Sequence, residues 1–287
     1  MPQTDKIATI ILNYNSCADC RKCIAYLKQQ QGVEQEIVVV DNCSQENDRI
    51  AVELLCKEQG CTFIANNENK GYNAGNNVGL RYAAEKGYGF ALIANPDMEF
   101  PQTDYLAILL AKMQEDADLV VCGSDIIGAD GIHQSPMGKE GNWRGSFAWI
   151  KEIFGKKSDA YDFIDNYSES HYCHKVSGCC FMIRTSFLEE INFFDEKVFL
   201  YCEEAILSRQ VEMAGKRMYY MATAQAVHRH VKSEKGDPVK RFKAWGKSRC
   251  YFIDRYSKDH WFGRLVAKLS MKLYVATFTL YCKFKRQ

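Results

Sequence analysis

Residues 92–100 read LIANPDMEF, and this stretch decides how the rest of the chain is interpreted. The apolar run that begins at Phe90 stops at Asn95-Pro96-Asp97, so it has the length of a buried strand rather than of a helix. Pro96 holds Asn95 in an extended conformation and stops a helix from running through it. We therefore predict the Asp97 carboxylate at the carboxyl end of a strand, which is where open α/β sheets bind ligands.

Two interpretations of this tripeptide remain open at this point. Asn-Pro-Asp is a common turn, and it could simply cap the helix that follows. A hard carboxylate at a strand end also suits a divalent cation such as Mg²⁺ or Mn²⁺. The choice between them depends on what surrounds the tripeptide.

Three strand-and-helix units precede it. Strands are predicted where β-branched residues run together, at 7–12, 36–40 and 61–65, and helices at 17–30, 48–59 and 80–86. The Asn- and Gly-rich stretch 66–79 lies between the third strand and the helix at 80–86. This alternation indicates an α/β fold, with a Rossmann-like, mostly parallel sheet flanked by helices.

The chain after the tripeptide is less regular. Helices are predicted at 106–114, 186–191 and 203–214, and strands at 118–122, 176–183, 219–221 and 226–228. Residues 123–161 are predicted as an irregular insertion with some helix. Its aromatic residues, Trp143, Phe147, Trp149 and Phe154, either pack in a core or face a substrate.

Composition and motifs exclude several classes of protein. A net charge of +1 over 287 residues gives no field that would attract nucleic acid. The sequence has no Walker loop, no dinucleotide fingerprint after the first strand and no G-x-S-x-G elbow. The first residues do not read as a signal peptide, so the thirteen cysteines are predicted to be reduced thiols in the cytoplasm.

Polar residues follow each of the first four strands, and such strand ends converge on one crevice. Farther on, Glu203 and Glu204 lie in an apolar frame. They either stabilise the start of a helix or, with a raised pKa, provide a general base. His228 and His230 alternate along the chain, so in a strand only one of them is expected to face the crevice.

Five segments in this order resemble one family: ATIILNYNS (8–16), IVVVDNCS (37–44), NENKGYNAGNNVGL (67–80), LIANPDMEF (92–100) and the stretch 176–230. They are similar to the inverting glycosyltransferases of family two, which have the GT-A fold. The rhamnosyltransferase-like branch of bacterial surface polysaccharide synthesis is the nearest match. The resemblance covers roughly residues 6–233, so we predict a catalytic domain at 1–234, followed by a basic, amphipathic helical extension at 235–287. The resemblance also implies a dTDP- or UDP-sugar donor, a divalent cation and a hydroxyl of a saccharide or lipid-linked acceptor.

The same resemblance assigns roles to individual residues. Glu204 falls at the catalytic base, with Glu203 beside it, and Asp97 and His228 fall at the cation. Asn95 replaces the first Asp of the D-x-D motif, and Ile206 stands where the branch has a further Asp. Contacts to the nucleotide-sugar are implied for Asn13, Asn15, Asp41, Asn69, Gly71, Asn76 and Asn95.

Two other functions and the role of the C-terminal stretch stay open. A sugar-nucleotide pyrophosphorylase would carry a Gly-rich basic loop after the first strand, where this chain has Asn13-Tyr14-Asn15-Ser16. A non-catalytic sugar-nucleotide-binding protein is the other rival. From Ser233 the chain is basic and predicted helical. It forms either a subdomain packed on the catalytic domain or an interfacial helix that makes the protein peripheral on the inner face of the membrane.

Overall fold

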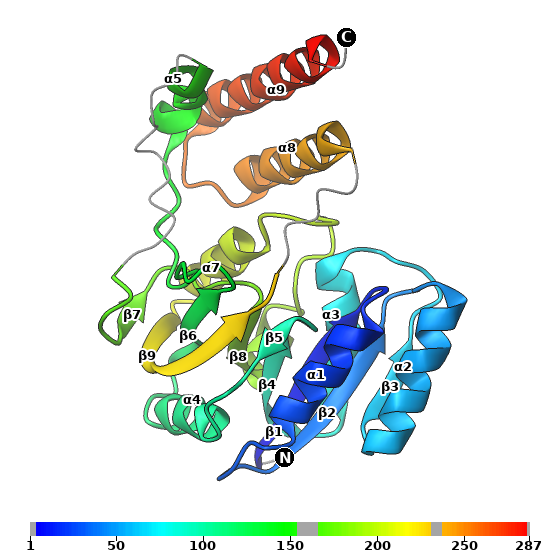
Figure 1. Cartoon of the computed structure of the whole chain (residues 1–287). Coiled ribbons are helices and arrows are strands. Elements are labelled where there is room, and N and C mark those ends of the chain that lie inside the picture. The colour runs from blue at the N-terminus through cyan, green and yellow to red at the C-terminus, as the bar shows by residue number, and fades with distance from the viewer. Residues whose placement is uncertain (1–3, 154–165, 231–236, 286–287) are drawn as a thin grey trace.

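A mixed nine-stranded sheet forms the centre of the computed structural model, which describes residues 4–153, 166–230 and 237–285 (Figure 1). The strands lie in the order β3-β2-β1-β4-β8-β6-β9-β5, and β7 pairs with β9. Their bounds are β1 Thr4–Asn13, β2 Gln35–Asp41, β3 Thr62–Ala65, β4 Tyr88–Ala94, β5 Met98–Glu99, β6 Leu119–Gly128, β7 His171–Cys173, β8 Cys180–Arg184 and β9 Arg217–His228.

The predicted α/β fold with a mostly parallel sheet is confirmed, with one qualification. β3, β2, β1, β4, β6 and β9 run in one direction, whereas β8 lies between β4 and β6 and is antiparallel to both. β5 and β7 are antiparallel to β9. The apolar run of β8 could not reveal this, because a fully buried strand reads the same in either direction.

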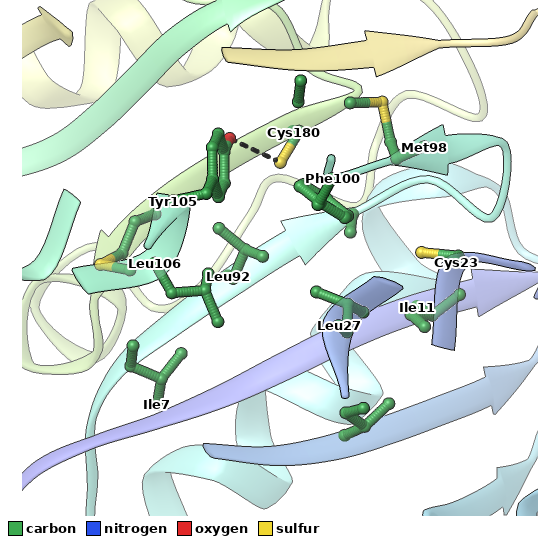
Figure 2. Packing of buried hydrophobic residues seen from close by; sticks show 14 of the residues in the cluster. Ile7, Ile11, Cys23, Leu27, Leu92, Met98, Phe100, Tyr105, Leu106 and Cys180 are labelled. Atoms are coloured by element: carbon green, nitrogen blue, oxygen red, sulfur yellow. Dashed lines mark hydrogen bonds between the residues drawn. The ribbon is translucent and has the colours of Figure 1, made fainter. Parts of the chain in front are cut away.

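Helices cover both faces of the sheet. Buried side chains of α1, α2 and α4 pack on one face, and those of α3, α6 and α7 pack on the other. Figure 2 shows the first of these layers, in which Leu27 of α1 and Leu106 of α4 lie near Ile11 and Leu92 of the sheet. The helices are α1 Cys17–Leu27, α2 Glu46–Gln59, α3 Tyr72–Glu85, α4 Tyr105–Gln114, η1 Trp143–Phe147, α5 Trp149–Ile153, α6 Thr185–Glu190, α7 Glu203–Met213, α8 Pro238–Arg255 and α9 Trp261–Phe284.

Most of the Asn- and Gly-rich stretch belongs to α3, which begins at Tyr72 and not at the predicted Leu80. Two of its asparagines bond outside the helix, whereas Asn76 Nδ2 donates to the carbonyl of Tyr72 within it. Asn73 Nδ2 donates to the carbonyl of Asp195 and Asn77 Nδ2 to that of Phe194. A Cβ at Gly75 or Gly79 would lie 2.6 Å from a strand side chain, so these glycines let the helix approach the sheet closely.

Two predicted short strands, 219–221 and 226–228, form the single strand β9. Its pairing with β6 shifts register between Ser124 and Asp125, and the residues that interrupt the apolar pattern lie at that irregularity. The insertion is also shorter than predicted, because β6 continues to Gly128.

The C-terminal helices α8 and α9 stack above α7 in Figure 1. Phe252 and Ile253 of α8 and Ala267 of α9 share one apolar cluster with Ala205 and Ile206 of α7. The insertion packs here too, with Trp149 Nε1 donating to Ser270 Oγ at 2.8 Å. The predicted boundary at 234/235 and Phe154 lie outside the described residues.

Candidate functional site

Asp97 is placed by a turn between β4 and the two-residue strand β5, so the tripeptide is a turn but does not cap a helix. The carboxylate meets two imidazoles that follow from β9. His228 Nε2 lies 3.2 Å from Asp97 Oδ1, and His230 Nδ1 lies 3.3 Å from Asp97 Oδ2. One ligand atom from each residue falls within 4.8 Å of the others, which is an arrangement that a metal ion can bridge.

Only one of the two histidines was expected to face the crevice, and that expectation is wrong. β9 ends at His228, and beyond it the pleat no longer alternates the side chains. The backbone N–H of Arg229 donates to the carbonyl of Asp97 at 2.9 Å, which turns the chain around the carboxylate. The two rings stack with centroids 5.4 Å apart.

Asp97 and His228 each favour the charged form of the other. Burial disfavours the charged form of His228, but its interactions with Asp97 and Cys179 together outweigh burial and raise the pKa of the imidazole to about 10. Burial alone would raise the pKa of the Asp97 carboxyl. The contacts of Asp97 with His228 outweigh burial and lower that pKa below its usual value. Gln134 Oε1 accepts a hydrogen bond from His228 Nδ1 at 2.8 Å, so Nε2 is the atom directed at Asp97.

The residues after β1 and β2 form a separate, buried network. Asn13 Nδ2 donates to Asp41 Oδ1 at 2.9 Å, to Ser44 Oγ and to Asp48 Oδ2. Asn15 lies at φ 57° and its Oδ1 accepts from the backbone N–H of Gln45. Asn13 and Asp41 are fully buried, so these bonds fix the loops at the strand ends. A direct contact with a nucleotide stays a prediction for them.

The segment before α3 is held close to the loop that leads into α7. Asn69 Oδ1 accepts from the backbone N–H of Gly71 at 2.9 Å. Gly71 has φ 105°, and a Cβ there would lie 2.2 Å from the carbonyl oxygen of Phe199. Only glycine fits this position. Asn76 is buried, with its Nδ2 bonded to the carbonyl of Tyr72.

Tyr72 lies between the strand end that leads to the metal-type cluster (Asp97, His228 and His230) and the paired glutamates. Its hydroxyl donates to the carbonyl of Gly178 at 2.7 Å and lies 3.2 Å from Asn95 Oδ1. A Cβ on Gly178 would in turn lie 2.8 Å from Glu204 Oε1. The structure therefore brings Asn95, Asp97 and Glu204 to one edge of the sheet, while Asn13 and Asp41 lie in their own network.

Glu203 and Glu204 begin α7, and their environments differ. Burial, together with repulsion from Glu204, raises the pKa of Glu203 to about 7. Among the described residues, Glu203 Oε1 has no hydrogen-bond partner. Glu204 instead lines a cavity of about 230 Å³ between α7, α8, α9 and the 137–146 loop. A hydroxyl-bearing substrate in that cavity would reach Glu204 and not Glu203.

Aromatic and charged side chains furnish this cavity. Trp143, Trp245 and Phe252 contribute rings. Lys175 Nζ bonds Glu140 Oε1 at 2.6 Å and Arg249 Nη1 bonds Glu140 Oε2 at 2.5 Å, and these three residues also line it. Trp149 of the insertion is buried in packing, as one of the two interpretations expected, and Trp143 lines the cavity. Contact of these aromatic residues with a substrate stays a prediction.

Sequence reasoning missed three residues of these networks. His230 carried a signal, because H-x-H at a strand end can place both rings on one ligand. Asp48 was assigned only to a helix start, and Tyr72 lay in the Asn- and Gly-rich stretch without a role of its own. Neither sequence position indicated its contacts.

The structure of GalNAc-T7 with UDP, GalNAc and Mn²⁺ is similar, with a TM-score of 0.62 at 14% identity over 87% of this chain and 50% of that one. Structural neighbours of this kind are GT-A glycosyltransferases, which confirms the predicted fold.

Two curated relatives carry glycosyltransferase names. The low-salt glycan biosynthesis hexosyltransferase Agl10 of Haloferax volcanii is 29% identical over 70% of this chain. The N-acetylglucosaminyl-diphospho-decaprenol L-rhamnosyltransferase of Mycobacterium tuberculosis is 32% identical over 29% of it. The chain spans 59% of the first relative's length and 27% of the second's. Residues 9–192, well over half of the chain, match the profile described as Glycosyl transferase family 2, and the chain therefore belongs to that family.

Proposed function

We propose that this glycosyltransferase moves a sugar from a dTDP- or UDP-sugar to a hydroxyl of a saccharide or lipid-linked acceptor, with inversion, in bacterial surface polysaccharide synthesis. The observation that carries the proposal is the position of Glu204. It lines the 230 Å³ cavity on one side and adjoins Gly178 on the other, and the Tyr72 hydroxyl links Gly178 to Asn95, two residues before Asp97. A base, Glu204, and the metal-type cluster therefore lie on two sides of one edge of the sheet.

Asp97, His228 and His230 fit a divalent cation, since carboxylate and imidazole are both good ligands and their atoms already converge. The two imidazoles favour Mn²⁺ over Mg²⁺, which prefers oxygen ligands. When bound, the cation supplies positive charge that offsets the charge growing on the departing diphosphate. Gln134 orients His228, and Tyr72 positions the strand end that carries Asn95.

In the proposed reaction Glu204 accepts the proton of the acceptor hydroxyl as that oxygen attacks the anomeric carbon. The bond between the anomeric carbon and the diphosphate breaks as the new bond forms, so one displacement inverts the centre.

The thirteen cysteines are free thiols, which supports a cytoplasmic location.

A donor panel tests this function. The full chain is incubated with UDP-, dTDP- and GDP-sugars in Mn²⁺, Mg²⁺ or EDTA, and release of the nucleoside diphosphate is measured. We expect metal-dependent release from a dTDP- or UDP-sugar. Binding of a donor without release under any condition would instead favour the non-catalytic binding protein, and no binding of any donor would contradict both.

A further inference from the structure

The helix α9 has two faces with different surroundings. Gly263, Ala267, Ser270 and Met271 are buried, and Gly263 packs so closely on Trp143 that a Cβ would lie 2.6 Å from its ring. The opposite face carries Leu265, Leu269, Leu273 and Leu280, which are 47–55% exposed. The first three are spaced by four residues and so form one stripe along the helix.

The charge beside this stripe is mostly positive, although Lys268 Nζ of α9 bonds Asp254 Oδ1 of α8 at 2.7 Å. α9 contains Arg264, Lys268, Lys272 and Lys283 and no acidic residue. On the neighbouring helix α8, Lys240, Lys243 and Lys247 are exposed. The whole chain has a net charge of only +1, whereas α8 and α9 together carry ten basic residues and one acidic residue. An apolar stripe bordered by lysines is complementary to a bilayer with anionic headgroups.

We infer that α9 lies flat in the interface of an anionic membrane, with Leu265, Leu269 and Leu273 inserted among the lipids. Among the described helices, α9 is the one long and apolar enough to cross a bilayer by length and composition. Its packing against η1 and α8 argues for the flat orientation, because one side of the helix is already occupied by protein. A second copy of the chain would offer the same basic rim and so would be repelled.

This docking has a consequence for the cavity beside Glu204, and this step rests on the proposed function. Ala267 and Met271, on the inner side of α9, line that cavity. A helix is about 10 Å across, so docking of its outer side brings the cavity within about that distance of the bilayer surface. The acceptor class that fits this position is a lipid-linked saccharide, whose reactive sugar stays close to the headgroups.

Vesicle flotation of the full chain tests the inference. Vesicles of phosphatidylglycerol and phosphatidylcholine are compared with vesicles of phosphatidylcholine alone. The variant Leu265→Ser/Leu269→Ser/Leu273→Ser is compared with Ile50→Ser/Leu54→Ser on α2, which removes equally exposed apolar side chains elsewhere. We expect binding to the anionic vesicles that high salt reverses. It should fall at least tenfold in the α9 variant and remain unchanged in the α2 variant.

Each other outcome has a defined meaning. Equal binding of the α9 and α2 variants overturns the inference, and so does binding that high salt does not release. A salt-stable dimer that the α9 variant disperses, without vesicle binding, would assign the stripe to a second copy. Should the triple variant unfold, Lys272→Glu/Lys283→Glu provides the test, with the same expected loss on anionic vesicles. UDP binding in Mn²⁺ without vesicles is measured in parallel, so a failure of the proposed function is seen separately.

Discussion

At the scale of single residues, the two adjacent glutamates are distinguished by what they face. Glu204 lines the cavity of about 230 Å³ and Glu203 does not. We therefore expect Glu204→Gln to lose about 10²–10⁴-fold in kcat while UDP affinity is kept, because the variant lacks the base but keeps the shape. Glu203→Gln is the matched control and should retain far more activity. Steady-state transfer kinetics of both variants decide the assignment, and a larger loss in Glu203→Gln would exchange the two roles.

Glu203 should also make the stability of the protein depend on pH. Its pKa of about 7 lies above the ordinary 4.5, so its contribution to the free energy of unfolding is fully present below pH 4.5 and is lost as the pH rises through 7. The shift corresponds to about 3 kcal/mol at most. We expect Glu203→Gln to raise the melting temperature at about pH 8 and not at acidic pH. Thermal unfolding across this range checks it, with the exposed Glu53→Gln as the control. Parallel curves for the two variants would contradict it.

The metal-type cluster contains one carboxylate, so the free protein is expected to hold a cation weakly and to gain affinity when a donor diphosphate adds oxygen ligands. Isothermal titration of Mn²⁺ with and without UDP measures this. His230→Ala should weaken the binding in both cases, whereas His171→Ala, a half-buried histidine of β7, should not. Tight Mn²⁺ binding by the protein without UDP, or no effect of His230→Ala, would contradict this assignment.

At the scale of elements, Ile206 shows why this chain departs from the rhamnosyltransferase-like pattern, which has an Asp there. The side chain is 1% exposed and packs with Phe252 and Ile253 of α8. An aspartate in that place would bury its carboxylate among these apolar side chains. We expect Ile206→Asp to lose about 3 kcal/mol or more of stability, and Ile206→Val only about 1 kcal/mol. Chemical denaturation measures both, and a stable Ile206→Asp protein would show that α8 packs differently on α7.

The sequence predicted the strands of this fold better than its helices and their contacts. Apolar runs located the first four strands correctly, and the polar residues behind them lie at strand ends as expected. α3 was partly missed because its stability comes from amide bonds to a segment more than a hundred residues away, as for Asn77 and Phe194. His230 was missed because pleat alternation holds only inside a strand. Such non-local contacts leave no pattern in the local sequence.

At the scale of the whole molecule, the cavity shows how distant parts of the chain combine into one site. Its wall takes residues from the 137–146 loop, from α7 and from both C-terminal helices. Residues of α8 and its C-terminal end also hold the loop before α7 through hydrogen bonds. Tyr251 and Tyr256 both donate to Asp195 Oδ2 at 2.6 Å, and Ser248 Oγ donates to the carbonyl of Leu200 at 2.7 Å. The C-terminal helices therefore position the segment that presents Glu203 and Glu204.

The division of the chain at residues 234/235 stays a prediction, and truncation tests it. A fragment of residues 1–234 would uncover Val198, Ala205 and Ile206, which share a core with α8 and α9. Loss of that core is expected to cost several kcal/mol, which lowers the melting temperature by about 10 °C or more. Transfer activity should fall even where UDP is still bound, because the start of α7 loses its support. A chain ending at Tyr281 is the control, since it keeps the shared core. A 1–234 fragment with unchanged melting temperature and kcat would show that the extension is an independent unit.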